Sequence, residues 1–170
     1  AEIYAGEQTM QSVRMAERWC AARQDHSAAS VYQELVAKVD PLMAVEKSPS
    51  YTIDVKRMRA IYRAFPDARF LHLTRHPVGQ CKSVMSLYEG TWALFVNSIE
   101  FMADRAVVEP QYAWHDFNIN ILNFLVSVPL EQQMRVRGED MMSDPPEYLG
   151  RICRWLGLRH DADAMRVGER

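Results

Sequence analysis

Apolar residues recur every three to four positions along most of the chain, a pattern that predicts amphipathic helices. Serine or aspartate caps, or a proline at the first helical position, mark where several of these helices begin. The predicted helices start near Glu7, at Ser27 or Ser30, at Asp54, at Pro77, near Ala113 and at Ser143 or Asp144, and a poorly bounded helical region extends over about 91–105.

Three short apolar runs between these helices predict buried strands: residues 42–45, 68–74 and 133–137. The clearest is 68–74, which is bounded by turn-forming residues and is too short for a helix. Strands separated by helices favour a parallel α/β sheet. Residues 107–111 predict a loop and no domain boundary is visible, so we expect residues 1–170 to form a single domain.

The composition limits the kind of protein. A chain of 170 residues, 48% of them hydrophobic, is long enough for one domain with a core. Its formal net charge of -2 lacks the basic field of nonspecific nucleic-acid binding. The cysteines form no CxxC pair, and no apolar run approaches the roughly 18–20 residues of a membrane span. We therefore expect a cytoplasmic protein with neither nucleic acid nor membrane as a partner.

The junction after the strand at 68–74 is the first candidate site. Arg75 stands at the carboxyl end of that strand, where parallel sheets bind ligands, and a helix begins at Pro77. Helix N-termini attract anions, and an arginine can grip a phosphate with two hydrogen bonds. Ser83, about two turns into the helix, could add another. The alternative is a structural arginine paired with a carboxylate, and a serine that faces solvent.

Two further strand ends carry charged groups. Lys47 could face an anion, and Glu46 could pair with it or with Arg75, although the residues that follow also form an ordinary turn. Arg137 is followed by Gly138, Glu139 and Asp140. This cluster could serve a site or form a structural ion-pair turn.

Polar residues on the helix near Ala113 form the last candidate. Asn118 shares an apolar face with Trp114 and Ile121, where a polar group needs a hydrogen-bond partner. Both a satisfied core asparagine and a catalytic one fit that position. His115 is expected at the surface, and His72 is expected to pack within the sheet.

Motifs of several common enzyme classes are absent. The glycines form neither a GxxxxGK[ST] loop nor a GxGxxG turn after a strand, and the chain has no HExxH or GxSxG motif. The sequence therefore lacks the main motifs that would indicate a nucleotide kinase or a dinucleotide dehydrogenase.

The order of the remaining pieces resembles a known family. Segment 45–83 has an EKSP turn, then a strand ending in arginine, a proline, and a serine eight residues after the arginine. This order resembles the middle of PAPS-dependent sulfotransferases. The stretch HLTRHPVGQCKS at 72–83 is most similar to sulfotransferase domains of bacterial modular polyketide synthases. Further matching positions are Trp114, 120–122, 128–129, Arg137 with Glu139 and Asp140, 144–145 and 155–158.

The resemblance implies a parallel sheet flanked by helices, in a P-loop-NTPase-like sulfotransferase fold. It implies that Arg75 and Ser83 hold the 3′-phosphate of PAPS, with Lys47 and Arg137 near other anionic groups. The family transfers a sulfuryl group from PAPS to a hydroxyl without a metal. In this branch the acceptor would be a β-hydroxyacyl chain on a carrier protein, with other synthase domains as partners.

The chain departs from the family pattern in two ways. The family's N-terminal phosphosulfate loop is absent from the sequence, so we expect a trimmed sulfotransferase-like domain. Some relatives carry a proposed histidine base where Asn118 stands, and an amide does not take up a proton near neutral pH. Glu46 and His115 are therefore the candidate bases, and the Asn118 amide could orient a hydroxyl.

Two other functions stay open at this point. The chain could be a non-catalytic remnant retained for binding or scaffolding, which the absent loop and Asn118 favour. It could also be a relative of P-loop kinases, which would require a Walker loop upstream.

Overall fold

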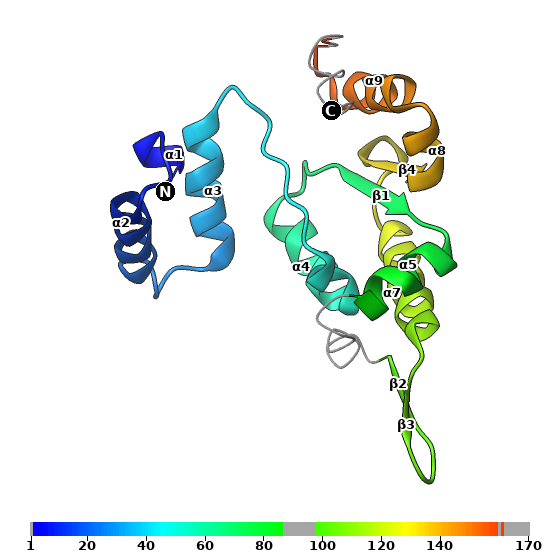
Figure 1. Ribbon diagram of the computed structural model, residues 1–170. Coiled ribbons are helices and arrows are strands. Elements are labelled where there is room, and N and C mark those ends of the chain that lie inside the picture. Colours follow the sequence, from blue (N-terminus) through cyan, green and yellow to red (C-terminus); the bar gives the residue numbers. More distant parts are fainter. Residues whose placement is uncertain (1, 87–97, 160, 162–170) are drawn as a thin grey trace. The chain divides into compact units, whose positions relative to one another are not determined.

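The computed structural model describes residues 2–86, 98–159 and 161, and its internal contacts divide the chain into two compact units, Ala1–Ser48 and Pro49–Arg170 (Figure 1). The expectation of a single domain stays a prediction. In the described ranges no helix combines the length and the hydrophobicity that a membrane span requires.

The first unit consists of helices, as the spacing of its apolar residues predicts. They are α1 (Glu2–Ala5), α2 (Met10–Ala21) and α3 (Ala28–Val39). Thr9 and Ser12 form a capping box at the start of α2. Ser27, one of the two predicted caps, begins α3 by accepting a hydrogen bond from the backbone N–H of Ser30.

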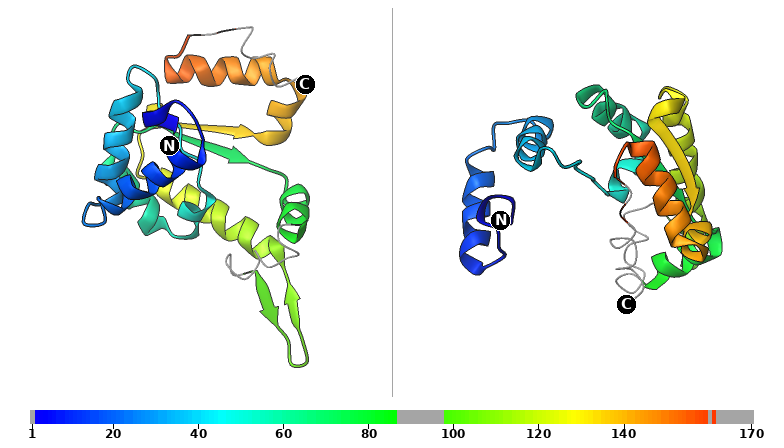
Figure 2. Two further views of the ribbon diagram at one scale, coloured as in Figure 1. Left: turned by 60° about the vertical axis from the view of Figure 1, so that its left-hand side comes forward. Right: turned by 90° about the horizontal axis from the view of Figure 1, so that it is seen from above.

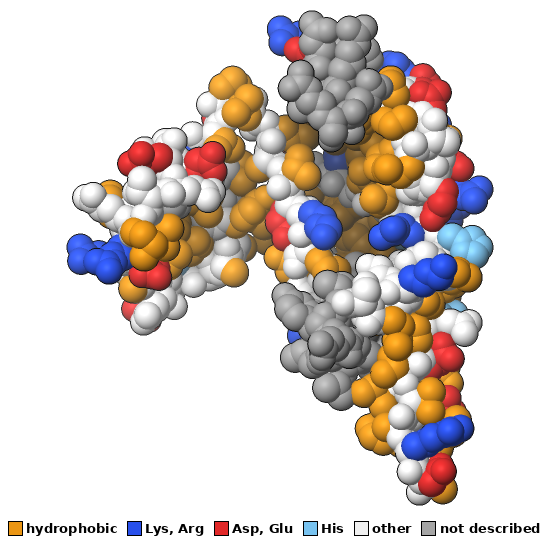
Figure 3. All heavy atoms as spheres, viewed as in Figure 1, with side chains coloured by type: hydrophobic (Ala, Val, Ile, Leu, Met, Phe, Trp, Pro, Cys, Tyr) orange, Lys and Arg blue, Asp and Glu red, His pale blue; other side chains and the backbone are white. Residues whose placement is uncertain are grey.

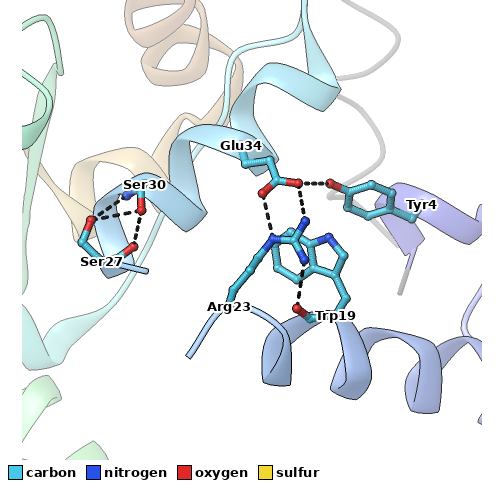
Figure 4. Close-up of polar contacts among 6 residues, drawn as sticks. All are labelled: Tyr4, Trp19, Arg23, Ser27, Ser30 and Glu34. Atoms are coloured by element: carbon cyan, nitrogen blue, oxygen red, sulfur yellow. Dashed lines mark hydrogen bonds and ion pairs between the residues drawn. The ribbon is translucent and has the colours of Figure 1, made fainter. Parts of the chain in front are cut away.

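A polar cluster joins these helices (Figure 4). The Arg23 guanidinium donates to both carboxylate oxygens of Glu34, at 2.8 and 2.9 Å, and to the Trp19 carbonyl at 3.0 Å. The Tyr4 hydroxyl also donates to Glu34, at 3.0 Å. The hydrogen bond from Arg23 is the main reason that the pKa of Glu34 lies below its usual value. The buried hydrophobic residues of the described chain all lie in the second unit, and this polar cluster links the three helices of the first.

The predicted buried strand at 42–45 is wrong. Residues 42–45 form no strand, and the side chains there are exposed, with Leu42 at 72% and Val45 at 82%. A strand needs a neighbour to pair its backbone groups, and the described residues of this unit offer none.

The second unit contains the predicted parallel pairing. Strand β1 (Phe70–Thr74) pairs with β4 (Gln133–Arg137) in a register that runs from Phe70↔Gln133 to Thr74↔Arg137. Both strands therefore end at the same edge (Figure 2). The prediction of β4 is confirmed to the residue, and that of β1 to within two residues.

Helices α4 (Val55–Ala64) and α7 (Pro110–Leu125) supply the core of this unit. Asp54 caps α4 as predicted, and the short helix η1 (Pro49–Ile53) precedes it. Met58 packs with Phe124, Leu125 and Val128, and the Phe70 ring meets that of Phe124 edge-on at 4.9 Å. The predicted apolar stripe of α7 is thus confirmed as its inward face.

A hairpin replaces the predicted helical region. Strands β2 (Ile99–Phe101) and β3 (Ala106–Val108) pair antiparallel. The helix predicted over about 91–105 is therefore wrong at 99–101, and the loop predicted over 107–111 is wrong at 107–108. Residues 91–97 lie outside the described part of the chain. Ser98, fully buried, anchors the hairpin because its hydroxyl accepts from the Ala113 N–H at 3.1 Å. Hydrophobic side chains line the hairpin (Figure 3), and Phe101 is 81% exposed.

The C-terminal elements follow the predicted signals. After the short helices η3 (Leu130–Gln132) and α8 (Gly138–Ser143), Asp144 caps α9 (Pro145–Leu156). Gly157 ends α9 with φ +73°, a conformation that glycine adopts without strain.

Candidate anion-binding site

The edge where β1 and β4 end brings two charged segments together. Thr74 pairs with Arg137, so Arg75 follows one strand while Gly138 and Glu139 follow the other. Helix α5 (Pro77–Ser86) begins two residues after Arg75, with Pro77 at its predicted first position. Arg75 thus lies just before a helix N-terminus, as the sequence predicts, and the parallel register brings it close to Gly138 of the neighbouring segment.

The Arg75 side chain is exposed at this edge. Ion pairs occur elsewhere among the described residues, but none of them involves Arg75, so the structural alternative of a carboxylate partner is not observed there. Its backbone is held instead, because the Trp114 indole Nε1–H donates to the Arg75 carbonyl at 2.9 Å. The result is a fixed backbone that carries a solvent-facing guanidinium.

The Glu139 carboxylate closes the other side of this corner. It accepts a hydrogen bond from the His76 backbone N–H at 2.8 Å, next to the first turn of α5. This bond is the main reason that the pKa of Glu139 lies below its usual value. Arg137, two residues earlier, contacts Asp140 at 3.8 Å and keeps 66% of its side chain exposed.

Gly138 allows the two strand ends to approach closely. A Cβ at this position would lie 3.3 Å from the Thr74 carbonyl oxygen and 3.4 Å from Cγ of Arg75. Both contacts are tight, so a side chain here would press against the segment that carries Arg75.

Ser83 lies on α5, half-buried, about 9 Å along the helix axis from Pro77. A shallow hollow between α5 and the start of α7 is lined by Cys81, Met85 and Glu109 among others. At about 100° per residue, Ser83 lies roughly on the opposite side of α5 from this hollow. The hollow is therefore separate from the face that Ser83 occupies.

The polar residues of α7 lie in different environments. Asn118 is half-buried, and its Oδ1 lies 3.1 Å from Nε2 of His72, while its Nδ2 donates to the Trp114 carbonyl at 2.7 Å. His72 is buried within the sheet, as predicted, with 6% of its surface exposed. His115 is exposed, also as predicted, and its Nδ1 lies 3.0 Å from Oδ1 of Asp116.

The other two candidates belong to the first unit. Glu46 and Lys47 are exposed in the segment after α3. Their part in the site stays a prediction.

Sequence reasoning missed the partners that shape the corner. The Trp114 indole was expected only on the apolar face of its helix, and Glu139 was expected only in a charged cluster. Each bonds to a residue far away in the sequence, at separations of 39 and 63 residues. No local pattern identifies the partner in such contacts, although a buried indole N–H usually has a hydrogen-bond acceptor.

Comparison with known proteins assigns the class. The family model described as "Sulfotransferase family" matches residues 1–162. Heparan sulfate glucosamine 3-O-sulfotransferase 6 of Mus musculus is 30% identical over 129 residues, which cover 71% of this chain and 37% of that protein. The Homo sapiens protein of the same name is 28% identical over 137 residues, 75% of this chain and 39% of that protein.

Solved structures show the same relationship. The sulfotransferase domain from the curacin biosynthetic pathway superposes with a TM-score of 0.66 at 25% identity, over 79% of this chain and 45% of that one. The sulfotransferase domain from the Synechococcus PCC 7002 olefin synthase gives a TM-score of 0.74 at 25% identity, over 94% of this chain and 52% of that one.

The chain therefore belongs to the sulfotransferase family and has its fold. The predicted family and the predicted fold class are both confirmed. The structural matches are domains of biosynthetic enzymes, in agreement with the predicted branch. The chain spans less than two fifths of the length of these curated relatives and about half that of the solved domains.

Proposed function

We propose that this chain is part of a PAPS-dependent sulfotransferase in which Arg75 and Ser83 hold the 3′-phosphate of the donor. The observation that carries the proposal is the placement of Arg75, exposed and without a described carboxylate partner, at the shared end of two parallel strands beside the start of α5. Arg137, at the end of the neighbouring strand, and Lys47 assist with other anionic groups of the donor.

The reaction moves a sulfuryl group from PAPS to a hydroxyl. The bond between sulfur and the donor's bridging oxygen breaks while sulfur bonds to the acceptor oxygen, the acceptor proton passes to a base, and PAP leaves. As in phosphoryl transfer, the protein's main contribution is to align donor and acceptor and to stabilise charge on the leaving phosphate. Glu46 and His115 are the candidate bases, since an amide such as Asn118 takes up no proton near neutral pH.

The acceptor in this proposal is a β-hydroxyacyl chain on a carrier protein, with other domains of a modular synthase as partners. Its support is the similarity to sulfotransferase domains from the curacin pathway and an olefin synthase. A second candidate is a non-catalytic sulfotransferase-like domain that binds or scaffolds. The observation that favours it is the engagement of both polar groups of Asn118 in internal hydrogen bonds, where the resemblance would put a base.

Calorimetric titration of the intact parent protein with PAP tests the proposed site. Arg75→Ala removes a charge-assisted contact and should weaken binding by about 10- to 150-fold. Ser83→Ala removes a neutral hydrogen bond and should have a smaller effect. Arg63→Ala, which removes an exposed arginine of α4, is the matched control and should bind as the wild type does.

Unchanged PAP affinity in a folded Arg75→Ala protein would refute the site assignment. Turnover separates the two candidate functions, because PAP release from PAPS with a carrier-bound β-hydroxyacyl acceptor is expected only of the enzyme. If the protein binds PAP but forms no PAP from PAPS in this assay, the non-catalytic function is favoured.

A further inference from the structure

A buried histidine on β1 is linked to the anion-binding corner through α7. The His72 imidazole, 6% exposed, meets Asn118 through Nε2, and Asn118 meets the Trp114 carbonyl. The Trp114 side chain then reaches the residue that follows β1, because its indole donates to the Arg75 carbonyl. His72 of β1 and two residues of α7 thus form one chain of hydrogen bonds that ends at Arg75 in the corner.

The donors and acceptors in this chain are determined. Since Nδ2 of Asn118 donates to the Trp114 carbonyl, the group that faces His72 is Oδ1, which can only accept. Nε2 of His72 must therefore carry the proton. Nδ1 is then an unprotonated acceptor, and it is buried with no hydrogen-bond partner among the described residues.

The environment keeps this imidazole neutral. Burial is the main cause that lowers the pKa of His72, and the positive charge of Arg135, its neighbour across the sheet, acts in the same direction. The hydrogen bond to Asn118 opposes them in part. A neutral side chain with one fixed tautomer is suited to holding a structure rather than to exchanging protons.

Two hydrogen-bond contacts, one from β1 and one from the residue after it, join the corner to α7 and fix its backbone. His72 and Arg75 lie about 10 Å apart along the strand, and Asn118 and Trp114 about 6 Å apart along the helix. Because Asn118 anchors the Trp114 backbone one turn away, the indole reaches Arg75 from a fixed position. Without the His72 contact, the indole would supply the one remaining hydrogen bond between α7 and this end of the strand among the described residues.

We propose that His72 and Asn118 are positioning residues that act through Trp114 to hold Arg75 toward the donor phosphate. The proposal rests on the proposed function, since the phosphate is the ligand that Arg75 is held for. Asn118 is on this account a structural partner of His72, and the acceptor proton goes to another group.

Calorimetry with PAP on the intact parent protein tests this role through a double-mutant cycle. His72→Leu removes the donor to Asn118 and should weaken PAP binding by about 2- to 12-fold, the loss of one neutral hydrogen bond. His72→Gln keeps an amide donor and should recover most of the affinity. In an Arg75→Ala background, His72→Leu should have no further effect, because its influence passes through Arg75.

A spectroscopic readout tests the buried pair directly. The ¹⁵N chemical shift of His72 Nδ1 should be that of an unprotonated ring nitrogen at neutral pH, and the ring should take up a proton only at a lower pH than an ordinary histidine does, because burial lowers its pKa. Asn118→Asp should make protonation easier by supplying a carboxylate. A His72 pKa at or above the ordinary value of about 6.5 would refute the effect of burial, and an Nδ1 shift typical of a protonated nitrogen at neutral pH would refute the fixed tautomer.

The outcomes distinguish the two proposals. Unchanged PAP affinity in folded His72→Leu, or an effect fully additive with Arg75→Ala, would overturn the positioning role and leave the proposed function standing. A wild-type parent protein that does not bind PAP would overturn the proposed function, and the positioning role with it.

Discussion

Replacing Gly138 by alanine tests how tightly the two strand ends are packed. The new Cβ would lie 3.3 Å from the Thr74 carbonyl oxygen and 3.4 Å from Cγ of Arg75. Thr74 has little freedom to move away, because it is held in the ladder opposite Arg137. Trp114 also holds the next carbonyl, that of Arg75. We therefore expect Gly138→Ala to be destabilising.

The magnitude follows from a matched substitution on a neighbouring helix. Gly79 lies inside α5, and apart from its chain neighbours and the backbone of its own helix no described atom lies within 4 Å of the Cβ that alanine would add. Gly79→Ala should stabilise the protein by about 0.5–1 kcal/mol, the advantage of alanine over glycine in a helix. Gly138 begins α8 and could gain as much, but overpacking typically costs about 1–3 kcal/mol. The expected net loss is about 0–2.5 kcal/mol.

Urea unfolding followed by circular dichroism measures both variants, and thermal melts should differ from the wild type by about 2–4 °C per kcal/mol. The two substitutions should shift stability in opposite directions. If Gly138→Ala is as stable as Gly79→Ala, the Thr74 carbonyl gives way at no cost, and the reasoning about a rigid corner is wrong.

Three further predictions concern the site. Folding lowers the pKa of Glu139, so the ionised carboxylate stabilises the folded protein above the unfolded pKa near 4.5. This contribution is lost as the pH falls through the lower folded pKa. Thermal melts below about pH 4.5 should show this loss in the wild type and not in Glu139→Gln. Asn118→His removes the amide donor to the Trp114 carbonyl and should reduce PAP affinity. If the variant instead sulfonates faster, with a pH profile that rises near 6.5, position 118 is the place of a catalytic base that this chain lacks. Residues 1–170 alone should release no PAP from PAPS above background, because the chain spans about half the length of the solved sulfotransferase domains; robust turnover would show that it holds a complete site.

Elements with local signals could be predicted from the sequence. Asp54 and Asp144 each accept a hydrogen bond from a backbone N–H two or three residues later, so the helix start is encoded within a few positions. Gly157 ends α9 by its own conformational freedom. Strand β4 could be predicted from its own short run of residues. The parallel sheet follows from the alternation of strands with helices.

Features that depend on distant partners could not be predicted. The segment at 42–45 has the composition of a strand, but no neighbour pairs with it within its unit. The hairpin at 99–108 forms because its two short runs pair with each other and Ser98 is anchored on α7, neither of which helical spacing reveals. Likewise, Arg75 could be chosen from its place after a strand, while the Trp114 and Glu139 contacts required the fold.

The pairing of β1 with β4 has a consequence for the order of folding events. The bond from His76 to Glu139 joins residues 63 positions apart, and every pair in the β1–β4 register has the same separation. Contacts of such long range form late, since the entropy of closing the intervening chain must be overcome first. Helices α4 and α7 can form from nearby residues before the strands meet. The corner around Arg75 is therefore expected to assemble among the last steps, so anion binding there would report that the whole second unit has folded.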